Sequence, residues 1–134
     1  MSETRLPADV QPVLRIPATP QDVNHMGSIF GGWIMSCVDM AGSIPAAIRA
    51  RGKVVTRAVE AFEFKKPVLV GDIVSLYADV VSIGNSSLRV DVNVYAQRMI
   101  NGDMETVKVT EAIVIYVAID DQGRPRALPD PKTI

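Results

Sequence analysis

The chain has 134 residues, of which 48% are hydrophobic and 22% charged, and its formal net charge is −1. This length predicts one domain over residues 1–134, and the near-neutral charge argues against nucleic-acid binding, which needs a basic patch. The one cysteine, Cys37, excludes an internal disulfide, and the N-terminus lacks a signal-peptide pattern, so we expect a cytoplasmic protein.

The first half of the chain predicts one short strand and one long helix. Residues 1–11 are polar and are expected to be loose, and residues 13–16 could form a strand that ends before Pro17. The apolar stretch 23–48 is interrupted by polar residues and glycines, so we expect a buried helix in place of a membrane span. Apolar side chains with helical period place this helix from residue 32 to about residue 51.

Two residues bear on where this helix ends. Gly52 directly follows the periodic stretch and is a good stop signal, since glycine readily adopts the left-handed conformation that closes many helices. Pro45 lies inside the stretch and removes the hydrogen bond to the carbonyl of Ala41, so it should kink or end the helix there. The two signals therefore disagree about the length of the helix.

The second half of the chain predicts a series of antiparallel strands joined by short turns. Apolar or β-branched residues alternate with polar ones over much of this region, and Asn101-Gly102-Asp103 is a strong hairpin signal. The tail 124–134 contains three prolines and should be extended. The predicted strands are residues 54–64, 73–83, 88–97 and 107–119.

A curved antiparallel sheet of about five strands around one apolar helix is the simplest packing of these elements, and it places the chain in the α+β class. One helix covers only one face of such a sheet. Long apolar edge strands can pair with a second copy of the chain. We therefore expect an obligate homodimer.

The most informative stretch runs from Asn24 to Asp39, where a glycine-containing polar turn leads into the helix. Gly31 and Gly32 let the backbone bend and approach a ligand, because no Cβ stands in the way. The first N–H groups of a helix lack partners within it and carry the positive end of the helix dipole. Such a helix start suits an oxygen that is negative or becomes negative during a reaction.

Further segments complete a pattern that runs from about residue 13 to residue 129. They are Phe64-Lys65-Lys66-Pro67-Val68, Val70-Gly71-Asp72, Thr110-Glu111-Ala112 and Gly123-Arg124-Pro125-Arg126-Ala127-Leu128-Pro129. Together with the block from Asn24 to Asp39, they resemble the hotdog-fold acyl-CoA thioesterases, and in particular their YciA-like acyl-CoA hydrolase branch. The resemblance implies a hotdog fold, in which one long central helix is wrapped by the antiparallel sheet.

For thioester hydrolysis the resemblance implies three catalytic residues. The N–H of Gly31 would polarise the thioester oxygen, and Asn24 would orient water or bind the same carbonyl. Asp39 would act as a general base on water or as the nucleophile. Asp39 lies roughly 12 Å from Gly31 along one helix, and the resemblance places the amide and the acid in opposite subunits, so that the site forms at the dimer interface.

Each of these residues also has a purely structural explanation. Asn24 could form an Asx turn, as asparagine commonly does in loops. Asp39 could be a buried carboxylate that accepts from backbone N–H groups, and Gly31 could serve only the turn.

The substrate also has to be held through the phosphates of CoA, which pair well with lysine and arginine. The resemblance favours residues near Lys66, in the turn at 86–87 and in the strand around Thr110. The candidate residues for binding the substrate and its CoA are Gly32, Arg57, Lys66, Ser86, Ser87 and Thr110.

Other chemistries find less support in the sequence. His25 is the one histidine and is tempting as an acid–base group, but the family motif does not require it. Cys37 has no histidine at a recognisable spacing, and one histidine with one cysteine argues against a zinc site. The serines lack a Gly-x-Ser-x-Gly context. We expect no metal and no cofactor, since CoA is part of the substrate.

The resulting prediction is an acyl-CoA thioesterase that hydrolyses short- to medium-chain acyl-CoA to free acid and CoA. The alternative is a hotdog protein that binds acyl-CoA without hydrolysing it, as a sensor or partner, which the absence of Asp39 would favour. A hotdog dehydratase or hydratase would need a histidine paired with an acid at the site. The resemblance also suggests a trimer of dimers, with no nucleic-acid or membrane partner.

Overall fold

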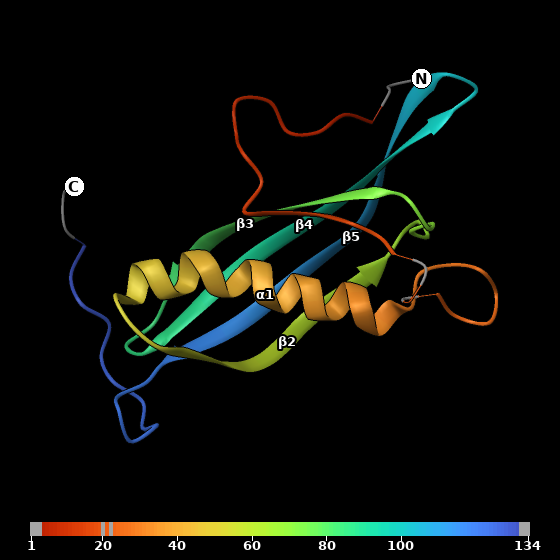
Figure 1. Ribbon diagram of the computed structural model, residues 1–134. Coiled ribbons are helices and arrows are strands. Elements are labelled where there is room, and N and C mark those ends of the chain that lie inside the picture. The colour runs from red at the N-terminus through yellow and green to blue at the C-terminus, as the bar shows by residue number, and fades with distance from the viewer. Residues whose placement is uncertain (1–3, 20, 22, 132–134) are drawn as a thin grey trace.

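The computed structural model describes residues 4–19, 21 and 23–131 of the chain. Over these residues one strand is followed by one helix and then by four strands (Figure 1). The elements are β1 (Leu14–Pro17), α1 (Gly31–Ala50), β2 (Val54–Phe64), β3 (Ile73–Ile83), β4 (Ser87–Ile100) and β5 (Asp103–Ala118).

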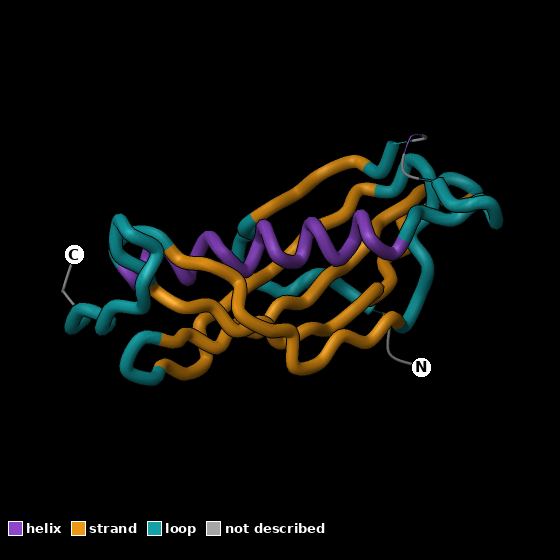
Figure 2. The backbone as a smooth tube through the Cα atoms, turned by 90° about the horizontal axis from the view of Figure 1, so that it is seen from below, coloured by secondary structure: helices purple, strands orange, loops and turns teal. Residues whose placement is uncertain are grey.

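The five strands form one antiparallel sheet in the order β1-β3-β4-β5-β2, which leaves β1 and β2 at its edges. Helix α1 lies along one face of this sheet, which curves around it (Figures 1 and 2). The predicted α+β architecture, with one long helix against about five antiparallel strands, is confirmed. The sheet does not close, so β2 has a strand neighbour on one side only within the described chain.

The core forms where alternating side chains of the sheet meet one face of α1. In β4, Val90, Val92 and Val94 are fully buried, while the residues between them point to the opposite face. Burial of such apolar side chains is the main favourable contribution to folding. The helix contributes a matching buried face, which consists of Ile34, Cys37, Val38, Ala41, Gly42, Ala46 and Ala50.

The predicted strands agree closely with the observed ones. β2 and β3 have the predicted bounds, and β1 is shifted by one residue. β4 and β5 extend further toward their shared hairpin than predicted, because only two residues form the turn between them. Asn101 and Gly102 both have positive φ, 51° and 85°, as a two-residue type I′ turn requires. The hairpin predicted at this position is confirmed.

The structure corrects the expectation that α1 could end at Pro45. The helix continues through this proline to Ala50. Ala41 and Ala46, on either side of it, are fully buried against the sheet. This tertiary packing holds the helix together across the position where proline removes one hydrogen bond.

The residue that closes α1 also differs from the prediction. Arg51, with φ 54°, adopts the left-handed conformation that was expected of Gly52. A Cβ on Gly52 would lie 2.8 Å from the guanidinium of Arg126, so this glycine makes room for a tertiary contact. Arg126 donates to the carbonyls of Ala50 at 2.8 Å and of Ile119 at 2.9 Å. The C-terminal segment is therefore held against the end of the helix and satisfies one of its last carbonyls.

The two terminal segments contain neither helix nor strand over residues 4–13 and 126–131. The loose N-terminus predicted for 1–11 and the extended tail predicted for 124–134 include residues 1–3 and 132–134, which lie outside the described residues. Within the described ranges, no helix is long and apolar enough to cross a membrane.

A buried ion pair fixes the segment that connects β2 to β3. Gly71 turns with a positive φ of 90°, and Asp72, which follows it, is only 1% exposed. Arg98 on β4 donates from Nε and Nη2 to the two carboxylate oxygens of Asp72, at 3.1 and 2.8 Å. The N–H of Leu69 donates to the same carboxylate at 2.9 Å, and Arg98 also donates to the carbonyl of Pro67. This segment is therefore tied to the centre of the sheet.

Replacing Arg98 with alanine should lower the free energy of unfolding by about 3–5 kcal/mol, because it leaves the buried carboxylate of Asp72 without its cation. Urea denaturation at a fixed protein concentration measures the change. The matched control is Arg89→Ala, which removes a half-exposed ion pair with Glu60 and should cost no more than about 1 kcal/mol. Equal losses in the two variants would contradict a special role for the buried pair.

Candidate active site

Helix α1 begins without a side-chain cap. Phe30 occupies the N-cap position with an extended backbone, and no side-chain hydrogen bond caps the helix start. The first turn also carries no acidic residue. The N–H of Gly31, the first of the helix, is therefore available to a ligand, with the positive end of the helix dipole behind it.

A cavity of about 380 Å³ lies at this helix start. It brings together Asn24, Gly31 and Lys66, three of the residues predicted from the sequence to act on the substrate or bind it. The loop before α1, the first turn of the helix and the segment after β2 each contribute to its wall. The other lining residues are Ser28, Ile29, Ile34, Phe64, Lys65, Pro67 and Val68.

The side chain of Asn24 has a structural contact and a remaining donor. Its Oδ1 accepts hydrogen bonds from the N–H groups of Met26 at 2.9 Å and Ser28 at 3.2 Å, which is the Asx turn considered as the structural alternative. Gly27, with φ 87°, lies within this turn. The Nδ2 group is then the hydrogen-bond donor that Asn24 can offer to a ligand in the cavity.

The two glycines at the helix start have different neighbours. A Cβ on Gly31 would touch the ring of Phe64 at 3.4 Å, in the wall of the cavity. A Cβ on Gly32 would lie 2.5 Å from the exposed ring of Phe30. Gly32 does not line the cavity, and its contact with substrate stays a prediction.

Asp39 lies on an exposed part of α1, two turns beyond the cavity, and does not line it. Its Oδ1 accepts from the hydroxyl of Thr56 on β2 at 2.5 Å and from that of Tyr116 on β5 at 3.1 Å. Neither contact is predicted from the sequence, because the partners come from strands far along the chain. One signal was present: a tyrosine among the apolar residues of a strand usually needs a polar partner for its hydroxyl.

The other predicted CoA-binding residues lie toward the Asp39 end of the molecule. Arg57 and Ser86 line a second hollow together with Thr56, the hydrogen-bond partner of Asp39. Arg57 and Ser87 line a third. Within one chain the predicted site residues therefore form two groups, one at the start of α1 and one beside Asp39.

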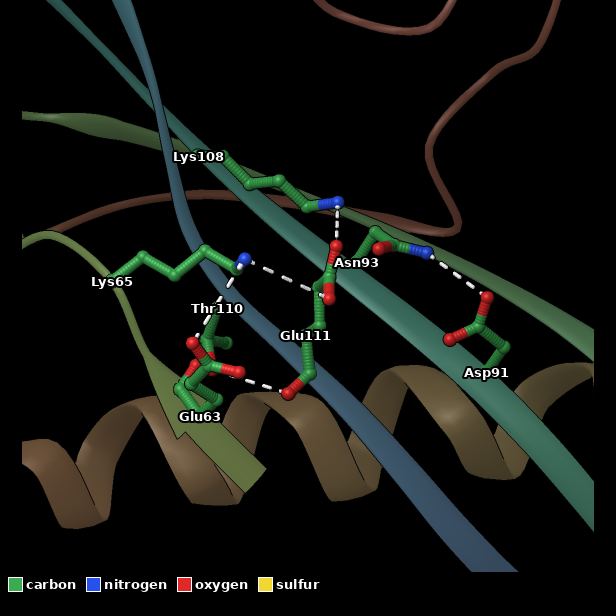
Figure 3. Close-up of polar contacts among 7 residues, drawn as sticks. All are labelled: Glu63, Lys65, Asp91, Asn93, Lys108, Thr110 and Glu111. Atoms are coloured by element: carbon green, nitrogen blue, oxygen red, sulfur yellow. Dashed lines mark hydrogen bonds and ion pairs between the residues drawn. The ribbon is translucent and has the colours of Figure 1, made fainter. Parts of the chain in front are cut away.

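Thr110 belongs to neither group. It is fully buried, and its hydroxyl donates to the carbonyl of Glu63 on the neighbouring strand β2 (Figure 3). Its contacts in the single chain are those of a residue that joins β5 to β2, and its role toward CoA stays a prediction.

A group of charged side chains surrounds Lys65 (Figure 3), which lines the cavity. Glu111 accepts a hydrogen bond from Nζ of Lys108 and forms an ion pair with Lys65 at 3.8 Å. Lys65 also lies 4.0 Å from the carboxylate of Glu63. Lys65 is thus shared between two carboxylates, whereas no residue of the described chain forms an ion pair with Lys66. Of the two adjacent lysines in the cavity wall, Lys66 keeps its charge available.

His25 and Cys37 are placed away from the cavity wall. His25 is exposed in the loop before α1, and Cys37 is 3% exposed on the core face of the helix. Neither lines the cavity. Among the residues that the structure describes, no three histidine, cysteine or acidic side chains come together as a metal site.

Comparison with known proteins connects this geometry to a family. The family model described as the thioesterase superfamily matches residues 26–101. The acyl-CoA thioester hydrolase YciA of Salmonella typhimurium is 45% identical over 118 residues, which is 87% of this chain and 89% of that protein.

Solved structures show the same similarity. The hexameric hotdog fold thioesterase Cj0915 of Campylobacter jejuni has a TM-score of 0.87 at 42% identity, over 90% of this chain and 91% of its own. The acyl-CoA hydrolase of Staphylococcus aureus, solved in complex with butyryl coenzyme A and coenzyme A, has a TM-score of 0.78 at 32% identity, over 87% of this chain and 70% of its own.

Lys108 should account for most of the perturbation of Glu111. The pKa of Glu111 is lowered from its ordinary value first by the hydrogen bond and charge of Lys108, and to a smaller extent by the charge of Lys65. Lys108→Met should therefore raise the pKa of Glu111 more than Lys65→Met does. NMR titration of the glutamate carboxyl groups measures both shifts, and equal shifts would contradict this order of causes.

Proposed function

This chain belongs to the thioesterase superfamily and, within it, to the YciA-like acyl-CoA thioester hydrolases, and we propose that it hydrolyses short- to medium-chain acyl-CoA to free acid and CoA. The observation that carries the proposal is the cavity at the start of α1, which joins the free N–H of Gly31 to the side chain of Asn24. The butyryl coenzyme A bound by the S. aureus relative supports a short acyl chain.

The proposed site is shared by two copies of the chain. All but two residues of β2 are exposed, and this strand forms an open edge of the sheet. An open edge beside apolar surface favours pairing with a second copy. The helix exposes such a surface in Met35, Met40, Ile44 and Ile48.

An antiparallel contact between the two β2 strands would extend the sheet and bury this surface. Two-fold symmetry makes the two α1 helices antiparallel, so that the start of one helix approaches the middle of the other. Asp39 of one copy would then face the cavity of its neighbour. The hexameric state of the C. jejuni relative supports further assembly as a trimer of such dimers.

In the assembled site the thioester oxygen accepts hydrogen bonds from the N–H of Gly31 and from Nδ2 of Asn24, and both donors stabilise its negative charge as the carbonyl is attacked. Asp39 of the partner subunit acts in one of two ways. As a general base it takes a proton from water, and the hydroxide adds to the carbonyl carbon. As a nucleophile it adds through a carboxylate oxygen and forms an anhydride, which water then hydrolyses. In both cases the carbon–sulfur bond breaks and CoA leaves as the thiol after protonation.

The nucleotide part of CoA is held by positive charge and hydroxyls at the mouth of the site. Lys66 is the available cation in the cavity wall, because Lys65 is engaged by two carboxylates. Arg57, Ser86 and Ser87 lie at the Asp39 end and would come from the other copy. No cofactor takes part, since CoA enters with the substrate. We also propose that the chain forms a single domain and that the protein is cytoplasmic.

Asp39→Ala should lower kcat/KM for acyl-CoA by on the order of a hundredfold or more, with the oligomer intact. The measurement is thiol release from acyl-CoAs of increasing chain length, with the mass of the assembly followed by light scattering. A wild-type protein that binds acyl-CoA but releases no thiol from any of them would be a binding protein, and the proposed hydrolysis would fail.

The same variant tests whether the site is shared. Asp39→Ala and Asn24→Ala should each be inactive alone. When the two variants are unfolded and refolded together, mixed dimers should form, each with one intact site. Activity should return to about a quarter of the wild-type value, because half of the dimers are mixed and one site in each of these is complete. No recovery in the refolded mixture would show that both residues act within one chain.

Lys66→Ala should raise KM for acyl-CoA by about tenfold, since it removes a charge-assisted contact with a phosphate. Lys65→Ala is the matched control and should change KM less. An acyl-pantetheine thioester, which lacks the nucleotide phosphates, should be hydrolysed equally by Lys66→Ala and wild type. If Lys66→Ala is equally slow on both substrates, Lys66 does not act on the phosphates.

A further inference from the structure

Tyr116 is a fully buried polar residue for which the mechanism above has no use. It lies on β5, and its hydroxyl points out of the apolar core into α1. The hydroxyl lies 2.7 Å from the main-chain carbonyl of Asp39 and 3.1 Å from Oδ1 of the same residue. One phenol group therefore contacts both the backbone and the side chain of the proposed catalytic acid.

The helix is built to admit this hydroxyl. Gly42 is buried in the middle of α1, where glycine costs about 0.5–1 kcal/mol relative to alanine. A Cβ at this position would lie 2.5 Å from the hydroxyl oxygen of Tyr116 and 3.1 Å from its ring. Any larger residue would push the phenol away from Asp39. The glycine is explained by this contact and not by a turn.

The phenol remains a donor whatever the working pH. Burial raises the pKa of Tyr116 well above its ordinary value, and the neighbouring carboxylate of Asp39 raises it further. The hydroxyl thus keeps its one proton, which the main-chain carbonyl and Oδ1 of Asp39 share, at any pH at which the protein is folded and active.

The surroundings of the carboxylate show what this contact does. Thr56 from β2 and Tyr116 from β5 both donate to Oδ1. Among the residues described by the structure, no lysine or arginine forms an ion pair with Asp39. This includes Arg57, which follows Thr56 in the sequence. Oδ2 accepts from neither hydroxyl, so its lone pairs stay available for another contact.

We propose that Tyr116 is a positioning residue for the reaction, which orients the carboxylate of Asp39 by holding Oδ1 while Gly42 gives its hydroxyl access to the helix. The inference rests on the proposed function and deepens it, because it assigns Oδ2 as the oxygen that takes a proton from water or attacks the thioester. A purely structural role would need only the hydrogen bond to the main-chain carbonyl of Asp39.

Tyr116→Phe separates these roles, since it removes the hydroxyl and keeps the ring. We expect kcat to fall about tenfold or more, with KM for acyl-CoA little changed. The matched control is Tyr77→Phe, which changes a buried tyrosine that packs edge to face on Tyr95 and should keep the wild-type kcat.

Gly42→Ala supplies a second route to the same contact. The added methyl group should displace the hydroxyl and lower kcat in the same way. If the added methyl group acts through the hydroxyl, the fold-loss of kcat in the double variant Gly42→Ala/Tyr116→Phe should be smaller than the product of the two single fold-losses. Losses that multiply in full would overturn the link between the glycine and the phenol.

The outcome that overturns the inference is a Tyr116→Phe protein with wild-type kcat, while Asp39→Ala is inactive. The proposed hydrolysis would then stand and Tyr116 would be structural. If the wild type hydrolyses nothing, the proposed function fails separately. The NMR chemical shift of the Asp39 carboxyl carbon in Tyr116→Phe still decides the contact, because an unchanged chemical shift means that the phenol does not act on the carboxylate.

Discussion

A single helix packs against an open five-stranded sheet, and most features of this molecule follow from that constraint. α1 packs Ile34, Val38 and Ala41 against the strands, but a helix has a second face, and here that face exposes Met40 and Ile48. The sheet likewise ends at β2 with an unpaired edge. The chain cannot cover either surface with its own described residues, so both favour contact with another copy.

Helix geometry explains why the reacting groups should also meet between copies. Two side chains that act on one atom from one helix usually stand three or four residues apart, where they share a face at neighbouring turns. Gly31 and Asp39 are roughly 12 Å apart along the axis, far more than one carbonyl group can span. The spacing is unsuited to one helix and well suited to an antiparallel pair. The open edge and the exposed helix face that favour a partner copy therefore accompany a spacing that favours one for the proposed chemistry.

Local rules were enough to predict what depends on neighbours in the sequence. The bounds of β2 and β3, the turn at Asn101 and Gly102 and the glycine-containing start of α1 all follow from alternation or from backbone freedom. The cavity joining Asn24, Gly31 and Lys66 agrees with the motif.

What local rules could not predict depends on contacts across the fold. Gly52 carries the standard stop signal, yet Arg51 closes the helix, and Gly52 lies instead against the guanidinium of Arg126. Pro45 does not end α1, because packing on the sheet outweighs one lost hydrogen bond. The Thr56 and Tyr116 hydroxyls reach Asp39 from strands that follow it by 17 and 77 residues, and no spacing rule connects them. Helix α1 contains three glycines and a proline among its 20 residues, a composition that disfavours an isolated helix. Its persistence must come from the sheet, so the positions of Gly31 and Asp39 exist only when the whole fold is formed, and the geometry of the site is linked to the stability of the sheet that holds it.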